Sequence, residues 1–351
     1  MAARMSAMTL PRSAPQRIDP AAQGGRFKEM YDVWMAGYAQ DYRGVTIDGQ
    51  PAPGLFQLER TGKSTAAILE AATALVGSLD AGKRAAVSFD IDSPLWRGWS
   101  NIHRNIMRHG LCLVDLDDRQ RELALALVRS GMSETAFQSA RSAMRLNEHI
   151  GELTGKPDEY GEWYYYLSLF GRPSPSEPWG WQLDGHHCNL NCFVLGDQLV
   201  LTPTLMGAEP VKADSGIYAG TSILREEEAR GWRFMASLSS GQRQRAAIGM
   251  ELPFDGYGSG FKDNLVMPYQ GIAWRELTGE QQAGLVDLVA LYAGRLPEVH
   301  AALKMQEVGR HLGETWFTWI GHVDETSPFY YRVHSPVIYI EFYHQPGIDL
   351  P

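Results

Sequence analysis

Residues 179–191, WGWQLDGHHCNLN, constrain the fold of this chain more than any other stretch, because aromatic and polar side chains alternate along their first half. Successive side chains of a β-strand point to opposite faces of the sheet. One face would carry the apolar residues and the other the polar ones, that is, Trp179, Trp181 and Leu183 against Gln182, Asp184 and His186. The alternation therefore predicts a strand with one face against the core and a chemically unusual polar face.

Gly185 interrupts this pattern. A glycine inside a strand often marks a β-bulge. A bulge here would bring His187, Asn189 and Asn191 round to the face of Asp184. With or without the bulge, we expect one polar wall that contains Asp184 and at least one histidine.

Asp184, His186 and His187 are suitable ligands for a first-row metal ion. Residues two apart on a strand are separated by about 7 Å, so that a carboxylate and an imidazole can converge on one ion or on one substrate atom. A purely structural pair of hydrogen-bonded histidines beside a turn is the competing interpretation. The sequence leaves both open.

The composition limits the classes of partner. Hydrophobic residues make up 44% of the 351 residues and aromatic residues 11%, which is ample for a sizeable core. The net charge of −9 argues against nucleic acid or an anionic membrane as a partner, because phosphate binding needs a basic surface. No apolar run approaches the length of a membrane span. Three cysteines indicate no disulfide framework and a reducing, cytoplasmic compartment.

Strand-like runs cluster in the second half of the chain, and helical patterns stand before and between them. This grouping predicts an α+β fold, an antiparallel sheet with helices packed on it. We expect the strands from Trp163 onward to form a single sheet, with one hairpin that turns at Gly196 and Asp197. Residues 1–25 are expected to be a disordered lead-in and residues 26–351 a single domain. No internal repeat is apparent.

Arg97 lies in the aromatic segment LWRGWSN, between Trp96 and Trp99 and ahead of a Ser-Asn pair. One interpretation is a substrate-contacting loop in which Arg97 binds an anion and reaches the same pocket as His186. In the other, the arginine stacks on tryptophan and fixes the loop in place.

Several stretches stand in a distinctive order and spacing: LWRGWSN at 95–101, EPWGW at 177–181, DGHH at 184–187, TPT at 202–204, FYYR at 329–332 and IEF at 340–342. With them the chain resembles the bacterial family known as domain of unknown function 3500, over most of its length from about Lys28 onward. The resemblance implies no established reaction. It also implies a His-x-His segment after the position of Pro351.

A metal-dependent enzyme is the first functional hypothesis, with a small polar or anionic molecule as its substrate. Its predicted ligands are Asp184, His186, His187 and, from the last strand, Glu341, because a carboxylate inside an aromatic strand needs a partner. His344, on the opposite face of that strand, is the alternative to Glu341. Zinc would suit hydrolysis, and iron with two histidines and a carboxylate would suit oxygen chemistry.

Two other classes of function remain open. In a metal-free enzyme, Asp184 would orient His187 as a general base, and Arg97 or Arg332 would bind an anionic substrate. In a non-catalytic binding protein, tryptophans such as Trp181 would form a stacking platform for a sugar or an aromatic ligand.

Overall fold

The computed structural model describes residues 26–103, 108–324 and 326–345. The predicted lead-in of residues 1–25 lies outside the described residues. No helix in the described ranges is both long enough and apolar enough to cross a membrane.

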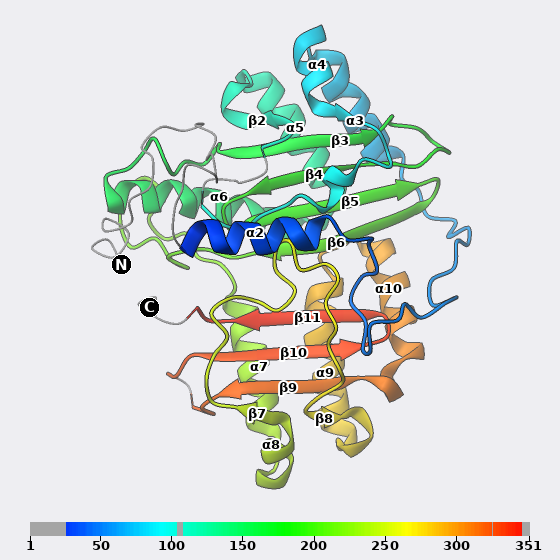
Figure 1. The fold of residues 1–351 in the computed structure, drawn as a ribbon, viewed down its shortest axis with the longest axis vertical. Helices are drawn as coiled ribbons and strands as arrows, with labels where there is room; N and C mark the ends of the chain where they lie inside the picture. Colours follow the sequence, from blue (N-terminus) through cyan, green and yellow to red (C-terminus); the bar gives the residue numbers. More distant parts are fainter. Residues whose placement is uncertain (1–25, 104–107, 325, 346–351) are drawn as a thin grey trace. The chain divides into compact units, whose positions relative to one another are not determined.

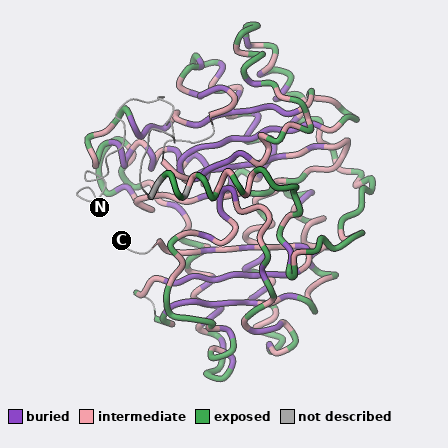
Figure 2. Tube along the Cα trace, in the orientation of Figure 1, coloured by how far each residue is buried: buried purple, intermediate pink, exposed green. Residues whose placement is uncertain are grey.

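The chain divides into two compact units, where one domain was expected. The first unit comprises Met1–Gln40 and Leu58–Ile223, and the second comprises Asp41–Gln57 and Leu224–Leu350. Each unit has its own sheet and its own buried core, as the purple central strands in Figure 2 show.

The sheet of the first unit has the strand order β1-β3-β4-β5-β6, with the short β2 also paired to β3. Its strands are β1 (Ser88–Phe89), β2 (Leu111–Cys112), β3 (Tyr165–Gly171), β4 (Trp179–Gly185), β5 (Cys188–Leu195) and β6 (Gln198–Met206). Only β1 runs parallel to its neighbour β3. The predicted turn at Gly196 and Asp197 is confirmed, because Leu195 pairs with Gln198 across it.

The helices of this unit include α2 (Arg26–Tyr38), α3 (Ala66–Ser78), α4 (Ala81–Val87), α5 (Asp118–Ser130) and α6 (Glu134–Thr154), with 3-10 turns η1 (Pro94–Arg97) and η2 (Leu113–Asp115). Trp179 and Trp181 are fully buried in the core, as the alternation predicted for the apolar face of β4. A Cβ at Gly131, just after α5, would press on the Trp181 ring.

The second unit has the strand order β11-β10-β9-β7, with the short β8 also paired to β9. Its strands are β7 (Ala247–Gly249), β8 (Ile272–Ala273), β9 (Trp316–Gly321), β10 (Phe329–Ser335) and β11 (Ile338–Tyr343). Its helices are α7 (Arg225–Ser237), α8 (Ser240–Ala246), α9 (Gly279–Ala293) and α10 (Glu298–Arg310), with 3-10 turns η3 (Trp274–Glu276) and η4 (Leu312–Glu314). The α7 and α9 helices contribute to one core with the apolar face of β9 and β10, which includes Phe317, Trp319, Tyr331 and Val333.

The α+β class is therefore confirmed, but the prediction of a single antiparallel sheet was wrong. The strands from Trp163 onward are divided between two sheets, and each sheet is mixed because β1 and β7 run parallel to their neighbours. Strand patterns alone do not show which strands pair, because pairing is decided by contacts between distant residues.

The two units repeat one topology (Figure 1). In each unit a seven-residue helix leads into a short strand: α4 leads into β1, and α8 leads into β7. This short strand runs parallel to the first strand of a three-stranded meander. A second short strand, β2 or β8, then pairs antiparallel with that same first strand. The meanders β3-β4-β5 and β9-β10-β11 follow after two helices. The chain thus contains an internal structural repeat, which was not apparent in the sequence.

Matching side chains support the repeat. Gln120 and Gln281 form equivalent capping boxes at the starts of α5 and α9. Each also donates a hydrogen bond from Nε2 to the carbonyl of an equivalent serine, Gln120 to Ser78 at 3.1 Å and Gln281 to Ser237 at 3.0 Å. The hydroxyl groups of Ser168 and Thr318 likewise donate to the carbonyls of the residues just before Gly110 and Gly271. Core side chains differ between the two units, and the spacing between helices and strands changes. The repeat is therefore hidden in the sequence.

Gly110 and Gly271 occupy the same place in the two units, directly before β2 and β8, and both have φ of 89°. A Cβ at Gly110 would overlap the carbonyl oxygen of Leu167, and one at Gly271 that of Phe317. Both positions therefore require glycine, for its left-handed backbone and for the close approach of the neighbouring strand.

We expect Gly271→Ala to lower the free energy of unfolding by roughly 1–3 kcal/mol through backbone strain alone, with the overlap adding to this loss. Gly241→Ala, inside α8, is the matched control, because an added Cβ there meets nothing within 4 Å. The control should be neutral or stabilising by up to about 1 kcal/mol. Urea denaturation of the two variants measures the difference, and equal stabilities would contradict the prediction.

Candidate metal centre

His186 and His187 form the two-residue turn between β4 and β5, because Gly185 pairs with Cys188 across them. The chain reverses here, so the predicted bulge is absent and β5 returns beside β4. His187 has φ of 58°, a left-handed conformation that is uncommon for residues other than glycine. The energetic cost of this conformation is a recognised mark of a functional site. The turn places two imidazoles side by side, with ring centroids 4.0 Å apart.

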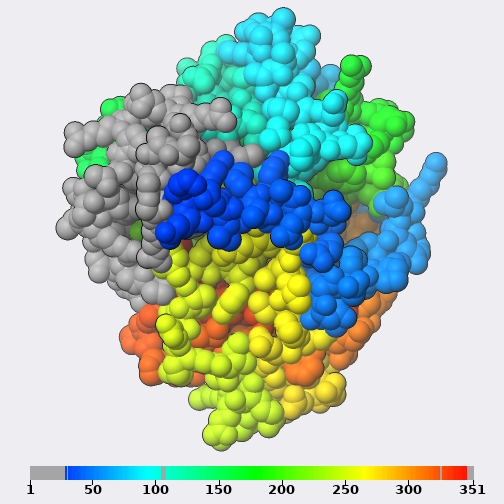
Figure 3. Space-filling model, in the orientation of Figure 1, coloured from blue at the N-terminus to red at the C-terminus, as the bar shows by residue number. Residues whose placement is uncertain are grey.

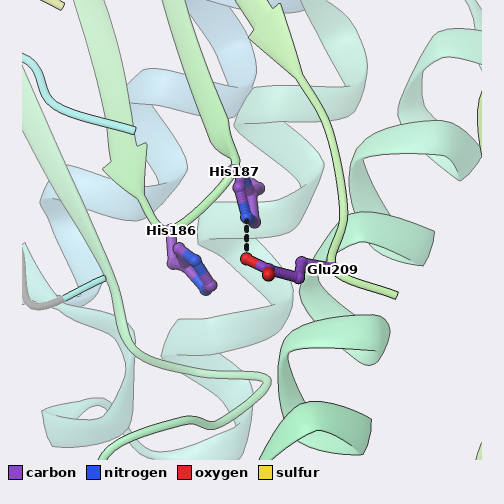
Figure 4. Close-up of side chains that lie close together, drawn as sticks. All are labelled: His186, His187 and Glu209. Carbon is purple, nitrogen blue, oxygen red and sulfur yellow. Dashed lines mark hydrogen bonds and ion pairs between the residues drawn. The ribbon is translucent and has the colours of Figure 1, made fainter. Parts of the chain in front are cut away.

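Glu209 comes from the loop that follows β6 and points toward the two histidines (Figure 4). His187 Nε2 lies 3.5 Å from Glu209 Oε2. One potential ligand atom from each of His186, His187 and Glu209 lies within 4.8 Å of the other two. Among the residues that the structure describes, this is the one group of at least three His, Cys, Asp or Glu side chains whose ligand atoms come this close together.

Asn147 on α6 determines which nitrogen of His186 carries the proton. The Asn147 side-chain Nδ2 donates to the carbonyl of Gly161 at 2.8 Å, so its Oδ1 is the atom 2.7 Å from His186 Nδ1. Because Oδ1 is an acceptor, Nδ1 of His186 carries the proton and Nε2 keeps its lone pair. Orientation of a histidine by such a partner is typical of metal sites.

Backbone hydrogen bonds hold the turn in place. His187 N–H donates to the carbonyl of Asn101 at 3.1 Å, and Gly207 N–H donates to the carbonyl of His187 at 2.7 Å. The Tyr165 hydroxyl donates to the carbonyl of His186 at 2.8 Å, and its ring occupies the space of a Cβ at Gly185. The imidazoles therefore sit on a turn that is fixed from several sides, as a preorganised site requires.

The pKa of His186 is well below its ordinary value. Burial is the main cause, and the neighbouring rings of His187 and His103 lower the pKa further. The imidazole is therefore neutral at physiological pH, which is the form that binds metals. The side chains of His187 and Glu209 are each 13% exposed, so the open side of the cluster remains within reach of a small molecule.

Asp184 serves a different purpose from the one that we expected. Its Oδ1 accepts hydrogen bonds from the Ser100 backbone N–H at 2.9 Å and from Asn189 Nδ2 at 2.5 Å. Asn189 also donates to the carbonyl of Ser100. These bonds fasten the segment around Ser100 over the polar face of the sheet. Burial raises the pKa of Asp184 to about 8, against the lowering effect of Ser100 and Asn189.

Glu341 and Arg332 lie in the second unit, on facing positions of β11 and β10. The Glu341 carboxylate accepts hydrogen bonds from the backbone N–H groups of Tyr257 and Gly258 and from the Tyr330 hydroxyl. The group that could hold a metal ion, His186, His187 and Glu209, belongs to the first unit. The alternative ligand, His344, approaches Glu228 with its Nε2 at 3.0 Å.

Arg97 contacts the end of α2. Its guanidinium donates to the carbonyls of Tyr38 and Gln40 at 3.2 and 2.6 Å and lies 5.8 Å from the centre of the Tyr38 ring. A cation at the carbonyl end of a helix is favourable. These contacts fit a structural role for Arg97 in fixing a segment in place, although the ring that it contacts here is that of Tyr38, where the structural interpretation expected a tryptophan.

Sequence reasoning missed both Glu209 and Asn147. Glu209 lies 22 residues after His187 and Asn147 lies 39 residues before His186. Neither stands in a motif with the histidines. Gly207 and Pro210 indicate a loop after the strand-like run that ends near Thr204, and this is the one sequence signal that points toward Glu209.

The structural role of Asp184 can be tested with two substitutions. Asp184→Ala leaves the buried backbone N–H of Ser100 without its acceptor and removes one of the three acceptors of Asn189 Nδ2, which should cost about 1–3 kcal/mol of stability. Asp184→Asn keeps an acceptor oxygen at that place and should retain most of the stability, because burial already disfavours the charged carboxylate. Thermal unfolding at pH 7 after treatment with a chelator compares the variants. Equal losses of stability in both variants would contradict the proposed role of the Asp184 oxygen as the acceptor that holds the Ser100 segment.

Comparison with known proteins identifies the family but no activity. Searches of curated proteins and of solved structures found no match. The family described as "Protein of unknown function (DUF3500)" matches residues 61–350, which is most of the chain and includes both units' sheets. The resemblance seen in the sequence is therefore confirmed, and this chain belongs to the DUF3500 family of proteins of unknown function.

Proposed function

We propose that this protein is a metal-dependent enzyme whose metal ion is bound by His186, His187 and Glu209. The convergence of their ligand atoms to within 4.8 Å is the observation that carries the proposal. We further propose a small polar or anionic molecule as its substrate, and a cytoplasmic location, which the three free, buried cysteines support.

The donor set suits zinc or iron. Two imidazoles and one carboxylate form the ligand set of hydrolytic zinc sites and also of non-haem iron oxygenases. In both classes the three protein ligands leave coordination positions open for water or substrate. A bound ion would supply Lewis acidity for hydrolysis if it is zinc, or oxygen chemistry if it is iron.

The surrounding residues have defined tasks in this proposal. Asn147 keeps the proton of His186 on Nδ1, so Nε2 would be free to bind the ion, and burial keeps that imidazole neutral. The carboxylate of Glu209 would balance part of the positive charge of the ion. His187 presents its Nε2 on the partly exposed side of the cluster, next to Glu209.

The observed contacts support the metal hypothesis over the two alternatives. In a metal-free acid–base enzyme Asp184 would orient a histidine, but its hydrogen bonds go to Ser100 and Asn189. The pair formed by His187 and Glu209 is the remaining candidate for such a dyad. A tryptophan-lined binding site would need accessible rings, and Trp181 is fully buried.

Metal analysis of the purified full-length protein tests the proposal directly. We expect about one zinc or iron ion per chain, because the three ligands surround a single site. His187→Ala and Glu209→Ala should each remove most of the bound metal and leave the melting temperature of the metal-free protein nearly unchanged, because both side chains are partly exposed. His311→Ala is the matched control, since His311 also pairs with a glutamate, Glu314, at 3.1 Å, but no third possible ligand joins this pair among the described residues.

Two outcomes would contradict the proposal. One is a wild-type protein that binds neither zinc nor iron after purification and after reloading with each metal. The other is undiminished metal content in both variants. Activity that persists in the metal-free protein and disappears in His187→Ala and Glu209→Ala would instead support the metal-free dyad.

Asn147 gives a second test of the same site. Asn147→Leu removes the acceptor at Nδ1 of His186 and should weaken zinc affinity by about 10–100-fold. Asn147→Asp keeps an acceptor and strengthens it, so zinc affinity should be retained or increased. Competition with a chromophoric chelator measures both affinities. Equal affinities for wild type and Asn147→Leu would show that Asn147 does not orient the ligand.

A further inference from the structure

Arg332 lies at the centre of the polar face of the second sheet. Its neighbours across β10 are Thr318 on β9 and Glu341 on β11. Only 1% of the Arg332 surface is exposed. A guanidinium cannot lose its proton in a protein, so a positive charge is buried at this position.

The structural repeat shows how unusual this charge is. The positions equivalent to Arg332 and Glu341 in the first sheet are Gln182 and Asn191, which face each other in the same way on β4 and β5. There the two carboxamides bond to each other at 2.7 Å, and Gln182 also bonds to His109 and to the Trp96 carbonyl. The first sheet therefore carries a neutral network at the place where the second carries charges.

The hydrogen bonds of Arg332 go to neutral oxygens. Nη2 donates to Gln270 Oε1 at 2.9 Å and to Thr318 Oγ1 at 3.4 Å, and Nη1 donates to the Tyr330 hydroxyl at 3.4 Å. In the described part of the chain no carboxylate forms an ion pair with it. Glu341 directs its two oxygens to Tyr330 and to the backbone of residues 257 and 258.

Two buried nitrogen atoms on this face have no hydrogen-bond partner among the described residues, Nε of Arg332 and Nδ1 of His334. His334 is two residues along β10 and therefore points to the same face as Arg332. Buried charges in proteins are normally paired, because an unpaired one is costly. A negatively charged group would be a suitable partner for this guanidinium.

Access to Arg332 is through Gln270. This residue is itself exposed although its carboxamide oxygen contacts the guanidinium. Gln270 belongs to the segment of residues 250–271, which crosses one face of strands β9 to β11 in Figure 1. Figure 3 shows this segment, coloured yellow-green to yellow, at the molecular surface. Rotation of this one surface side chain would free a donor position on Nη2 of Arg332.

We propose that the second unit binds a small anion, a carboxylate or a phosphate, at Arg332, and that an oxygen of the anion replaces Gln270 Oε1 on the guanidinium. The planar fork of arginine donors matches both carboxylate and phosphate, which bind it through two parallel hydrogen bonds. His334 offers a further polar contact on the same face. This inference does not depend on the metal centre.

Calorimetric titration of the full-length protein with succinate, inorganic phosphate and, as a neutral mimic, succinamide tests the proposal. We expect saturable binding of at least one of the two anions and none of succinamide. The anion that binds more tightly identifies the ligand as a carboxylate or a phosphate. Arg332→Gln, which installs the side chain found at the equivalent place of the first sheet, should weaken binding at least about tenfold.

Two further variants make the result independent of folding defects. Gln270→Ala removes the competing carboxamide and should tighten anion binding, which a damaged protein cannot do. Arg245→Gln is the charge-matched control, since Arg245 pairs with Glu276 and its side chain is 51% exposed; it should bind the anion as the wild type does. Absence of saturable binding of both anions, or unchanged affinity in both Arg332→Gln and Gln270→Ala, would overturn the proposal.

Discussion

The structure of both units depends on burying a polar face of a β-sheet. Each meander has one apolar face against helices and one polar face beneath a long segment between two short strands. A buried polar group without a partner costs free energy, so the covering segment must satisfy the side chains below it. In the first unit Asp184, Asn189 and Ser100 do this, and in the second the backbone of residues 257 and 258 bonds to Glu341.

This constraint explains why the candidate metal centre lies where it does. The hydrogen bond to Asp184 holds the segment around Ser100, and the carbonyl of the next residue, Asn101, accepts a hydrogen bond from the N–H of His187. Asp184, which the sequence analysis predicted as a ligand, thus helps to hold the turn of the candidate ligands in place through the backbone. The turn can keep its strained residue because hydrogen bonds from three directions determine its conformation.

The repeated topology separates the requirements of the scaffold from those of the sites. Gly110 and Gly271, and the capping glutamines Gln120 and Gln281, recur because the fold needs them in both units. The turns that join the central strands differ. The first unit has His186 and His187 there, and the second has Pro336 and Val337 at the same place. Similar scaffolds therefore carry different chemistry, which is common among folds.

Local patterns in the sequence determined the α+β class, the buried tryptophans of β4 and the hairpin at Gly196 and Asp197, because these features depend on neighbouring residues. The candidate site was only partly predictable. Alternation marked the histidines as unusual, but no glycine or asparagine indicated that they form a turn. Only the tertiary structure brought Glu209 and Asn147 close to the two histidines and divided the strands between two sheets. These contacts join residues that are far apart in the chain, and local sequence patterns do not indicate which distant residues will pair.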